Sequence, residues 1–326
     1  MFKKRIATAT VITGVLAGVT ALSATPVTAN TVEHKGAQTL QTLNLAVYPS
    51  LDYAPMFVGL KQGFFAKYGL SLNITDVYTG AGLFAAISGG ADDLATNSPV
   101  TGANAIAQGL PIQLVQVTDY QPTSGNTDVL VAKNSPIKSL SQLAGKAVGI
   151  SSVHGAFQLG LNYALQKAGV DPSSVNVLAV APQNQGPTLL AGQLGATVTQ
   201  DPWLTQDLQT GSYRSLGNPF AKFPYKVPVG AFWATTSTLN SKPGLLRSFK
   251  QAWAFSVAYV TKHPASLGAV IPVYTSLPPS LVKKMTLPQY ATAITASSMT
   301  GVLSLMQKYG WITTPPSFSQ IYWNGK

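Results

Sequence analysis

Short apolar runs alternate along the chain with segments of helical periodicity. Residues 43–48 and 70–78 are typical of strands, and residues 54–68 between them repeat apolar positions at helical spacing up to Gly69. Strands that alternate with helices are characteristic of β-α-β units in parallel sheets. The pattern therefore predicts an α/β fold.

The alternation continues and then restarts. Further strands are expected at 94–96 and 112–117, and helices at 83–88 and 99–108. The polar, turn-forming segment 120–127 interrupts the pattern. A second series follows it, with strands expected at 129–132, 147–150, 175–180 and around Val198, and helices at 139–143, 156–168 and 186–191.

The two series share one construction. Residues 83–99 and 188–202 each contain a helix pattern, a glycine turn, a strand pattern and a polar pair before a proline. Two similar halves leave a crevice at the carboxyl ends of their strands, where α/β proteins bind ligands. After an apolar run at 232–235 the chain is expected to be mainly helical, at 245–261, 265–271, 279–285, 287–296 and 299–309.

The first residues follow the order of a secretory signal. Basic residues at positions 3–5 precede an apolar run, and small residues follow it up to Ala29. We predict a cleaved signal peptide at 1–29, a flexible segment at 30–39 and a periplasmic or secreted mature protein. A retained membrane anchor is the alternative, which the weak hydrophobicity of the run disfavours.

The chain contains no cysteine. Disulfides, thiol nucleophiles and the lipid-bearing cysteine of lipoproteins are therefore excluded. The three histidines, His34, His154 and His263, are not spaced like a metal site. The sequence also lacks the G-x-S-x-G pattern of a nucleophile elbow. We predict no metal, no cofactor and no enzymatic activity.

The charge is positive but dispersed. The formal net charge is +11, and removal of residues 1–29 lowers it to +8. After residue 29, Lys and Arg occur singly or as the pair Lys283-Lys284, so we expect no nucleic-acid partner. Carboxylates are scarce, and Glu33 is the only glutamate. Because carboxylate protonation drives acid unfolding, adaptation to an acidic exterior is one hypothesis, and compositional drift is the other.

Several motifs, taken in order, resemble one family. Residues 135–140 (SPIKSL) followed by 143–149 (LAGKAVG) resemble the lobe-crossing signature of the nitrate, sulfonate, taurine and thiamine-precursor binding proteins of ABC importers. The similarity runs over almost the whole mature chain. Its other parts are Tyr53-Ala54-Pro55 with Gly59, the GFF…GL pattern from Gly63 to Leu70, the G-x-x-D turn within 88–95, and the cap segments 253–264 and 310–312.

The resemblance implies a type II periplasmic-binding fold, which is α/β with two discontinuous lobes, a hinge and a C-terminal helical cap on lobe one. Lobe one would comprise 40–128 and 236–326, and lobe two 129–235. The hinge would lie near 128–130 and 234–237. A protein of this kind would be a monomer that delivers a small-molecule ligand to an ABC permease and ATPase.

The expected ligand is a small organic anion, either an aliphatic sulfonate of the taurine type or nitrate. Gly195 stands where the family has an acid and Gln200 where it has an aromatic, so ligand identity cannot be carried over. A receptor for a thiamine-pyrimidine or flavin-type precursor, and a sensor-associated binding module, are the alternatives. Two enzymes of similar architecture, a thiamine-pyrimidine synthase and a sulfinate desulfinase, depend on cysteines that this chain lacks.

Candidate binding residues lie at expected helix starts and strand ends facing the crevice. Backbone N–H groups at helix N-termini bind anions without a full countercharge, and glycine lets the backbone approach a ligand. The alternatives are plain strand-to-helix turns, a half-buried surface role for Tyr53 and a capping role for His154. The candidates are Tyr53, Gly80, Ala81, Gly82, Asn97, Ser98, Ser151, Ser152, His154, Gly155, Gln183, Asp201 and Trp203.

Overall fold

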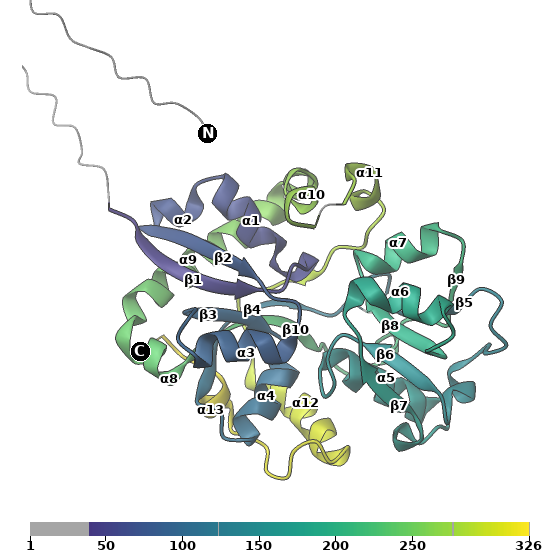
Figure 1. Cartoon of the computed structure of the whole chain (residues 1–326). Helices are drawn as coiled ribbons and strands as arrows, with labels where there is room; N and C mark the ends of the chain where they lie inside the picture. The colour runs from purple at the N-terminus through teal and green to yellow at the C-terminus, as the bar shows by residue number, and fades with distance from the viewer. Residues whose placement is uncertain (1–38, 123, 276, 326) are drawn as a thin grey trace, which may run out of the picture. The chain divides into compact units, whose positions relative to one another are not determined.

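The computed structural model describes residues 39–122, 124–275 and 277–325, which form two β-sheets covered by helices (Figure 1). The expected α/β class is confirmed. The expected signal peptide lies outside the described residues, and so does all of the expected flexible segment except Thr39.

The first sheet has six strands in the order β11-β4-β10-β3-β1-β2. Strands β1, β2 and β3 run parallel, whereas β10 is antiparallel to its neighbours β3 and β4. The short β11 pairs with β4 at the edge. The strands are β1 Gln41–Val47, β2 Leu70–Asp76, β3 Leu94–Asn97, β4 Ile112–Tyr120, β10 Pro228–Thr235 and β11 Gln289–Tyr290.

The second sheet has five strands in the order β7-β6-β8-β5-β9. Strand β6 is parallel to β7 and β8, and β5 is antiparallel to β8 and β9. The strands are β5 Thr127–Ala132, β6 Ala147–Ile150, β7 Asn176–Ala179, β8 Ala196–Gln200 and β9 Tyr213–Ser215.

The two sheets repeat one strand order, as the internal repeat in the sequence predicts. Each has three parallel strands (β2-β1-β3 and β7-β6-β8) followed by one antiparallel strand, β10 or β5. That strand reaches its sheet from the other sheet, because β5 follows β4 along the chain and β10 follows β9. The expectation of parallel sheets is therefore correct for these three-stranded parts and wrong where β5, β10 and the short β11 pair with their neighbours.

The return crossing also comes earlier than expected. The boundary at 236 places β10 in lobe two, and this is wrong because β10 pairs with β3 and β4 of the first sheet. The chain crosses between the sheets at residues 121–126 and 216–227 instead. The expected hinge segments also lie outside these crossings. Residues 128–130 are within β5, and residues 234–237 end β10 and begin the next helix.

The division into two lobes stays a prediction, with its boundaries moved. We use "first lobe" for residues 39–120 and 228–325, and "second lobe" for residues 127–215. The helices of the first lobe are α1 Ala54–Lys61, α2 Phe64–Lys67, α3 Gly80–Ser88, α4 Pro99–Ala107, α8 Thr236–Ser241, α9 Pro243–Lys262, α10 Ile271–Thr275, α11 Pro279–Val282, α12 Ala296–Lys308 and α13 Phe318–Ile321, and those of the second lobe are α5 Ala156–Lys167, α6 Pro182–Leu190 and α7 Trp203–Gln209.

Many helices agree with the sequence pattern. The pattern does not predict α7, α8 or α13, and the helices expected at 139–143 and 265–271 are 3-10 helices at Leu140–Leu143 and Pro264–Ala269. Two further segments differ. The single helix expected at 54–68 is divided at Gly63, whose φ of 70° lies in the left-handed region that interrupts a helix. The helix expected at 287–296 is wrong. Gln289 and Tyr290 form β11 there, because pairing with the edge of β4 satisfies their backbone groups.

Helices cover both faces of the first sheet. On one face α1 and α9 pack around Phe232 and Trp253, and on the other α3, α4 and α12 pack around Trp233. The second sheet packs against α5. Ala156 of α5 and Phe220 of the crossing segment also join the core at α4, so the two lobes are in apolar contact. None of the described helices combines the length and apolar character needed to cross a membrane.

Candidate functional site

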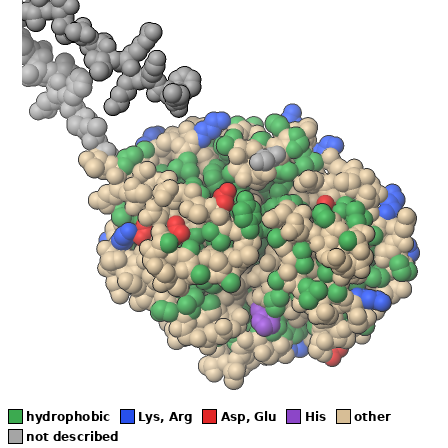
Figure 2. Space-filling model, viewed as in Figure 1, with side chains coloured by type: hydrophobic (Ala, Val, Ile, Leu, Met, Phe, Trp, Pro, Cys, Tyr) green, Lys and Arg blue, Asp and Glu red, His purple; other side chains and the backbone are tan. Residues whose placement is uncertain are grey.

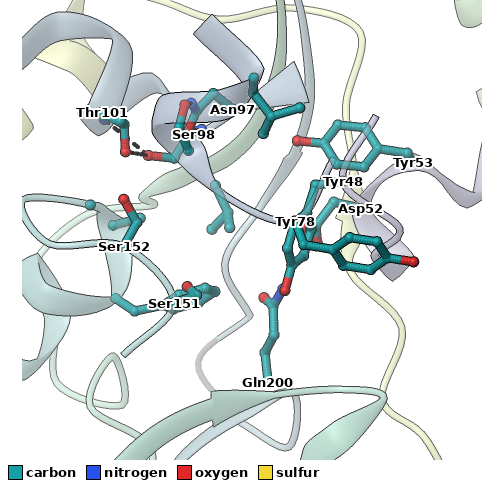
Figure 3. Close-up of a pocket in the computed structure, with 16 residues that line it drawn as sticks. Tyr48, Asp52, Tyr53, Tyr78, Asn97, Ser98, Thr101, Ser151, Ser152 and Gln200 are labelled. Atoms are coloured by element: carbon teal, nitrogen blue, oxygen red, sulfur yellow. Dashed lines mark hydrogen bonds between the residues drawn. The ribbon is translucent and has the colours of Figure 1, made fainter. Parts of the chain in front are cut away.

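A recess of about 560 Å³, counting its solvent-open part, lies where the carboxyl ends of β1, β3, β6 and β8 meet. Both lobes contribute to its walls (Figure 3). A ligand bound here would contact both lobes. The lining consists of Tyr48, Asp52, Tyr53, Tyr78, Gly80, Leu83, Asn97, Ser98, Thr101, Ser151, Ser152, Gly155, Ala156, Phe157, Gln200 and Val229.

The first-lobe wall is held by a buried amide. Asn97, at the end of β3, donates from Nδ2 to the carbonyl of Gly80 (3.1 Å) and accepts through Oδ1 from the N–H of Ser98 (3.0 Å). These two bonds join the start of α3 to the start of α4. The Ser98 hydroxyl caps α4 by accepting from the N–H of Thr101 (3.0 Å).

The second-lobe wall is the turn between β6 and α5. Ser151 and Ser152 follow β6, and Gly155 is the residue before the first turn of α5. No side chain caps this helix start. The first N–H groups of an α-helix have no partner within the helix and carry a partial positive charge. They can therefore bind an acidic group of a ligand.

The inner end of the recess has a different character. Tyr48 follows β1, Asp52 lies in the 3-10 turn Leu51–Tyr53, and Gln200 ends β8 on the facing lobe (Figure 3). Asp52 accepts a hydrogen bond from the Ser50 hydroxyl (2.8 Å) and another from the Gln200 side chain. The Gln200 Oε1 atom and the Tyr48 hydroxyl are buried without a partner.

A second carboxyl lies behind Asp52. Asp119 of β4 is in hydrogen-bond contact with Asp52, and its Oδ1 accepts from the Thr118 hydroxyl (2.8 Å) and the N–H of Gly230 (3.0 Å). Burial raises the pKa of Asp52 to about 6. Burial and the nearby charge of Asp52 raise the pKa of Asp119 well above its usual range. Two carboxylates in contact repel each other, so ionising both costs free energy. The pair therefore holds one proton near neutral pH.

Seven candidate residues line the recess together. Tyr53 is almost fully buried, with its ring 5.4 Å from that of Phe232 in an edge-on contact. The half-buried surface role considered for it is therefore wrong. The seven are Tyr53, Gly80, Asn97, Ser98, Ser151, Ser152 and Gly155.

Two grooves adjoin the recess, and three other candidate residues line them. Ala81 borders one groove, and Gln183 and Trp203 border the other. Tyr78 borders both grooves and the recess. The Trp203 ring centre lies 6.1 Å from that of Tyr48, so it stands next to the recess without lining it. These three candidates lie beside the recess and not in its lining, and a role for them in ligand binding stays a prediction.

The last three candidates make local bonds instead of facing the recess. The N–H of Gly82 donates to the Thr79 hydroxyl that caps α3 (3.2 Å). His154 stacks on Trp311 with ring centres 5.0 Å apart. Asp201 accepts from the N–H groups of Thr205 (3.0 Å) and Thr286 (3.1 Å). None of the three lines the recess, and a role for them in ligand binding stays a prediction.

Five polar residues of the lining are not among the candidates from the sequence, namely Tyr48, Asp52, Tyr78, Thr101 and Gln200. Tyr48 stands directly after a strand, so the rule that found Asn97 could have found it. The sequence identifies Gln200 as a departure from the family pattern but does not identify it as a site residue. Asp52 gives no such signal, because it lies in the 3-10 turn Leu51–Tyr53 and not at the end of a strand.

The recess holds no basic side chain. Its lining contains no Lys, Arg or His, and among the described residues no group of three or more His, Cys, Asp or Glu could hold a metal ion. Figure 2 shows lysine and arginine spread around the rim of one face, not gathered over one area. The polar groups of the lining are therefore backbone amides, hydroxyls, the side-chain amides of Asn97 and Gln200, and one acid.

The family model described as NMT1/THI5 like matches residues 50–266. The chain belongs to this family. The match includes every residue of the recess lining except Tyr48. The NMT1/THI5-like region thus contains the crossing segments and both walls of the site.

Two curated proteins are similar over parts of the chain. A protein of Escherichia coli (strain K12) named "Putative aliphatic sulfonates-binding protein" is 26% identical over 219 residues, which are 63% of this chain and 66% of that protein. A "Putative thiamine biosynthesis protein" of Haemophilus influenzae is 30% identical over 151 residues, 46% of each chain. The chain thus matches less than two thirds of each relative's length.

Solved structures show the same fold. The crystal structure of the periplasmic aliphatic sulphonate binding protein SsuA from Escherichia coli has a TM-score of 0.69 at 17% identity, over 87% of this chain and 97% of that one. The NMT1/THI5-like chain therefore has a periplasmic-binding-protein fold, as the sequence motifs predict.

Proposed function

We propose that this chain is the extracytoplasmic solute-binding protein of an ABC importer. It binds a small organic molecule between its lobes as a monomer and delivers it to permease and ATPase subunits. The observation that carries the proposal is one recess lined by helix starts and strand ends of both lobes (Figure 3). A ligand that contacts both lobes shifts the population toward the closed form, which a membrane partner can recognise.

We rank small organic anions first, namely aliphatic sulfonates of the taurine type or nitrate. The uncapped start of α5 and the start of α3 at Gly80 supply amide groups suited to an acidic group. The Escherichia coli relative and the SsuA structure carry sulfonate-binding names. A binding role without catalysis agrees with those names and with the lack of cysteine in the chain.

A thiamine-pyrimidine or flavin-type precursor is the second candidate. Three tyrosine side chains, Tyr48, Tyr53 and Tyr78, line the recess and could stack on a flat ring. The Haemophilus influenzae relative is named for thiamine biosynthesis. A sensor-associated role would use the same recess with a different partner, and no contact in the structure favours it.

A thermal-shift screen tests the proposal. The compounds are taurine, alkanesulfonates, nitrate, hydroxymethylpyrimidine and riboflavin, and we expect at least one to raise the unfolding midpoint without being consumed. The Gly80→Val variant should lose this response. A Cβ atom at Gly80 would lie 3.3 Å from Ser152 Oγ, so the added methyl groups would fill the space between the walls.

The matched control is Gly268→Val. A Cβ atom there meets no atom within 4 Å, so ligand response should be kept. Absence of any midpoint shift across the screen, with a folded protein, would contradict the proposed function. A response kept in Gly80→Val would show that the ligand binds elsewhere.

A further inference from the structure

The inner end of the recess offers hydrogen-bond acceptors, while the α5 end offers donors. Asp52, Gln200 and Tyr48 come from separate segments of both lobes and line the same end. Asp52 and Gln200 are 6% exposed each, so bulk water does not satisfy them. Such a set needs donor groups from a partner.

Asp52 has room for one more donor. A carboxylate has about four acceptor positions. The described partners of Asp52 are the Ser50 hydroxyl, the Gln200 side chain and the proton shared with Asp119. One acceptor position of a buried carboxylate is therefore left for a ligand.

Gln200 and Tyr48 also have buried polar atoms that lack a hydrogen-bond donor. The Gln200 amide donates to Asp52, which leaves its Oε1 atom buried and without a partner. The Tyr48 hydroxyl, which burial keeps neutral by raising its pKa, is also without a partner. Unpaired buried polar atoms cost free energy, and a bound ligand with N–H groups would remove that cost.

No basic side chain of the recess donates to these acceptors, because the lining has no Lys, Arg or His. A purely anionic ligand would meet the negative charge of the Asp52–Asp119 pair at this end. Opposite charge or a neutral donor is favoured there, and like charge is disfavoured. The two ends of the recess therefore suit opposite groups of one molecule.

We infer that the ligand is bifunctional, with an amino or ammonium group bonded to Asp52, Gln200 and Tyr48 and an acidic group at the starts of α3 and α5. The inference rests on the proposed function, since it assumes that the recess is the ligand site. It narrows the small organic anions to those with an N–H donor, of which an aminoalkanesulfonate is the simplest example.

Calorimetric titration with matched pairs tests the inference. Taurine and ethanesulfonate share the acidic group and differ in the amino group, and β-alanine and propanoate form a second pair. The amino member should bind at least about tenfold more tightly, because it alone makes a charge-assisted bond to Asp52. Asp52→Asn should abolish most of this preference, while the exposed Asp76→Asn should keep it.

The Tyr48→Phe variant separates binding from folding. It removes a buried hydroxyl that has no partner in the protein, so the unfolding midpoint without ligand should stay unchanged or rise. The affinity for the amino member should fall about threefold to tenfold, which is the usual range for one lost hydrogen bond.

The outcomes separate the two claims. Equal affinity within a pair, or tighter binding of ethanesulfonate or propanoate, overturns the inference and leaves the proposed function standing. No binding by either pair also overturns it, and a shift by another screened compound would then preserve only the proposed function. If nothing in the whole screen binds, both claims fail.

Discussion

At the scale of single residues, the Asp52–Asp119 pair dominates the chemistry of the site. Both side chains are buried, and burial raises the pKa of each. The charge of Asp52 raises the pKa of Asp119 further, whereas the hydrogen bond from Asp119 offsets part of the rise at Asp52. The folded protein therefore holds protons that the unfolded chain has already released near neutral pH. This couples stability to pH in the direction opposite to that of an ion-paired carboxylate.

We expect the protein to become more stable as the pH falls from 8 to 5. The pKa of Asp52 is about 6 in the folded state against 3.8 ordinarily, so the folded state binds more protons between these values. Stability is then gained as the pH falls through about 6 and lost as it rises. The gain should be on the order of 2 kcal/mol, measured by urea unfolding at each pH.

The Asp119→Asn variant should flatten this pH dependence. Its amide can donate to Asp52 permanently, and its oxygen can still accept from Thr118 and Gly230. We expect higher stability than the parent at pH 8 and a smaller slope, with the rest of the slope due to Asp201 and Asp207, whose pKa values burial also raises to about 6. Asp76→Asn is the control. Steady loss of stability from pH 8 to 5 would contradict both the pair and the hypothesis of an acidic exterior.

The site residues could be predicted where they lie at the start of a helix or at the carboxyl end of a strand. Gly80 and Gly155 begin helices and Asn97 ends a strand, so rules about carboxyl ends were sufficient. The acid pair could not be predicted in this way. Asp119 lies within β4 and meets Asp52 only because β10 brings Gly230 and the 3-10 turn together over that strand.

At the scale of elements, the crossing of α1 over α9 depends on a glycine. An added Cβ atom at Gly59 would overlap the Ser256 hydroxyl and lie 2.9 Å from the Phe65 ring. Ser256 is fully buried and donates to the carbonyl of Ala252 (2.7 Å). The glycine of the family's opening motif therefore permits two helices to approach closely.

Gly59→Ala should destabilise the protein by about 1 to 3 kcal/mol, the range for overpacking a buried site. Urea unfolding is the measurement, and Gly268→Ala, which has open space around the new Cβ atom, should cost little. In a Ser256→Ala background the cost at Gly59 should shrink, because the overlapping oxygen is gone. An equal cost in both backgrounds would show that backbone effects and not this contact are responsible.

The periodic pattern predicted elements well where their own side chains determine them. Strand β6 agrees to the residue, and α5 and α9 agree within two residues at each end. It failed where a distant partner decides the structure. β10 joins the first sheet through pairing with β3 and β4, and β11 forms because β4 offers a free edge. Local periodicity carries no information about either partner.

At the scale of the whole molecule, contacts outside the recess hold the two lobes together. His154 of the second lobe stacks on Trp311 of the first, and the Tyr309 hydroxyl donates to Gln166 Oε1 across the same boundary (3.1 Å). If the lobes separate to admit a ligand, these contacts exist only in the closed form. They then contribute to affinity without touching the ligand.

His154→Asn should weaken ligand binding about threefold to tenfold while leaving the recess intact. Asparagine tolerates the φ of 57° at this position, so the turn before α5 should be kept. His263→Asn is the control, because His263 contacts only the Tyr259 ring of its own lobe among the ring contacts described (4.6 Å). Calorimetry gives the affinities, and small-angle scattering should show a more open ligand-free ensemble. Unchanged affinity and scattering would contradict a role for the stack in closure.

The Thr286 contact has a practical use. The N–H of Thr286 donates to Asp201 of the second lobe, and its carbonyl accepts from Asn126 (3.4 Å). This residue of the first lobe therefore contacts both the second lobe and the crossing segment at 121–126. The neighbouring Lys284 is exposed, and the chain has no cysteine of its own. Lys284→Cys would give one unique attachment point for a fluorescent dye, whose emission would report loading in real time and make the protein a sensor for its cargo.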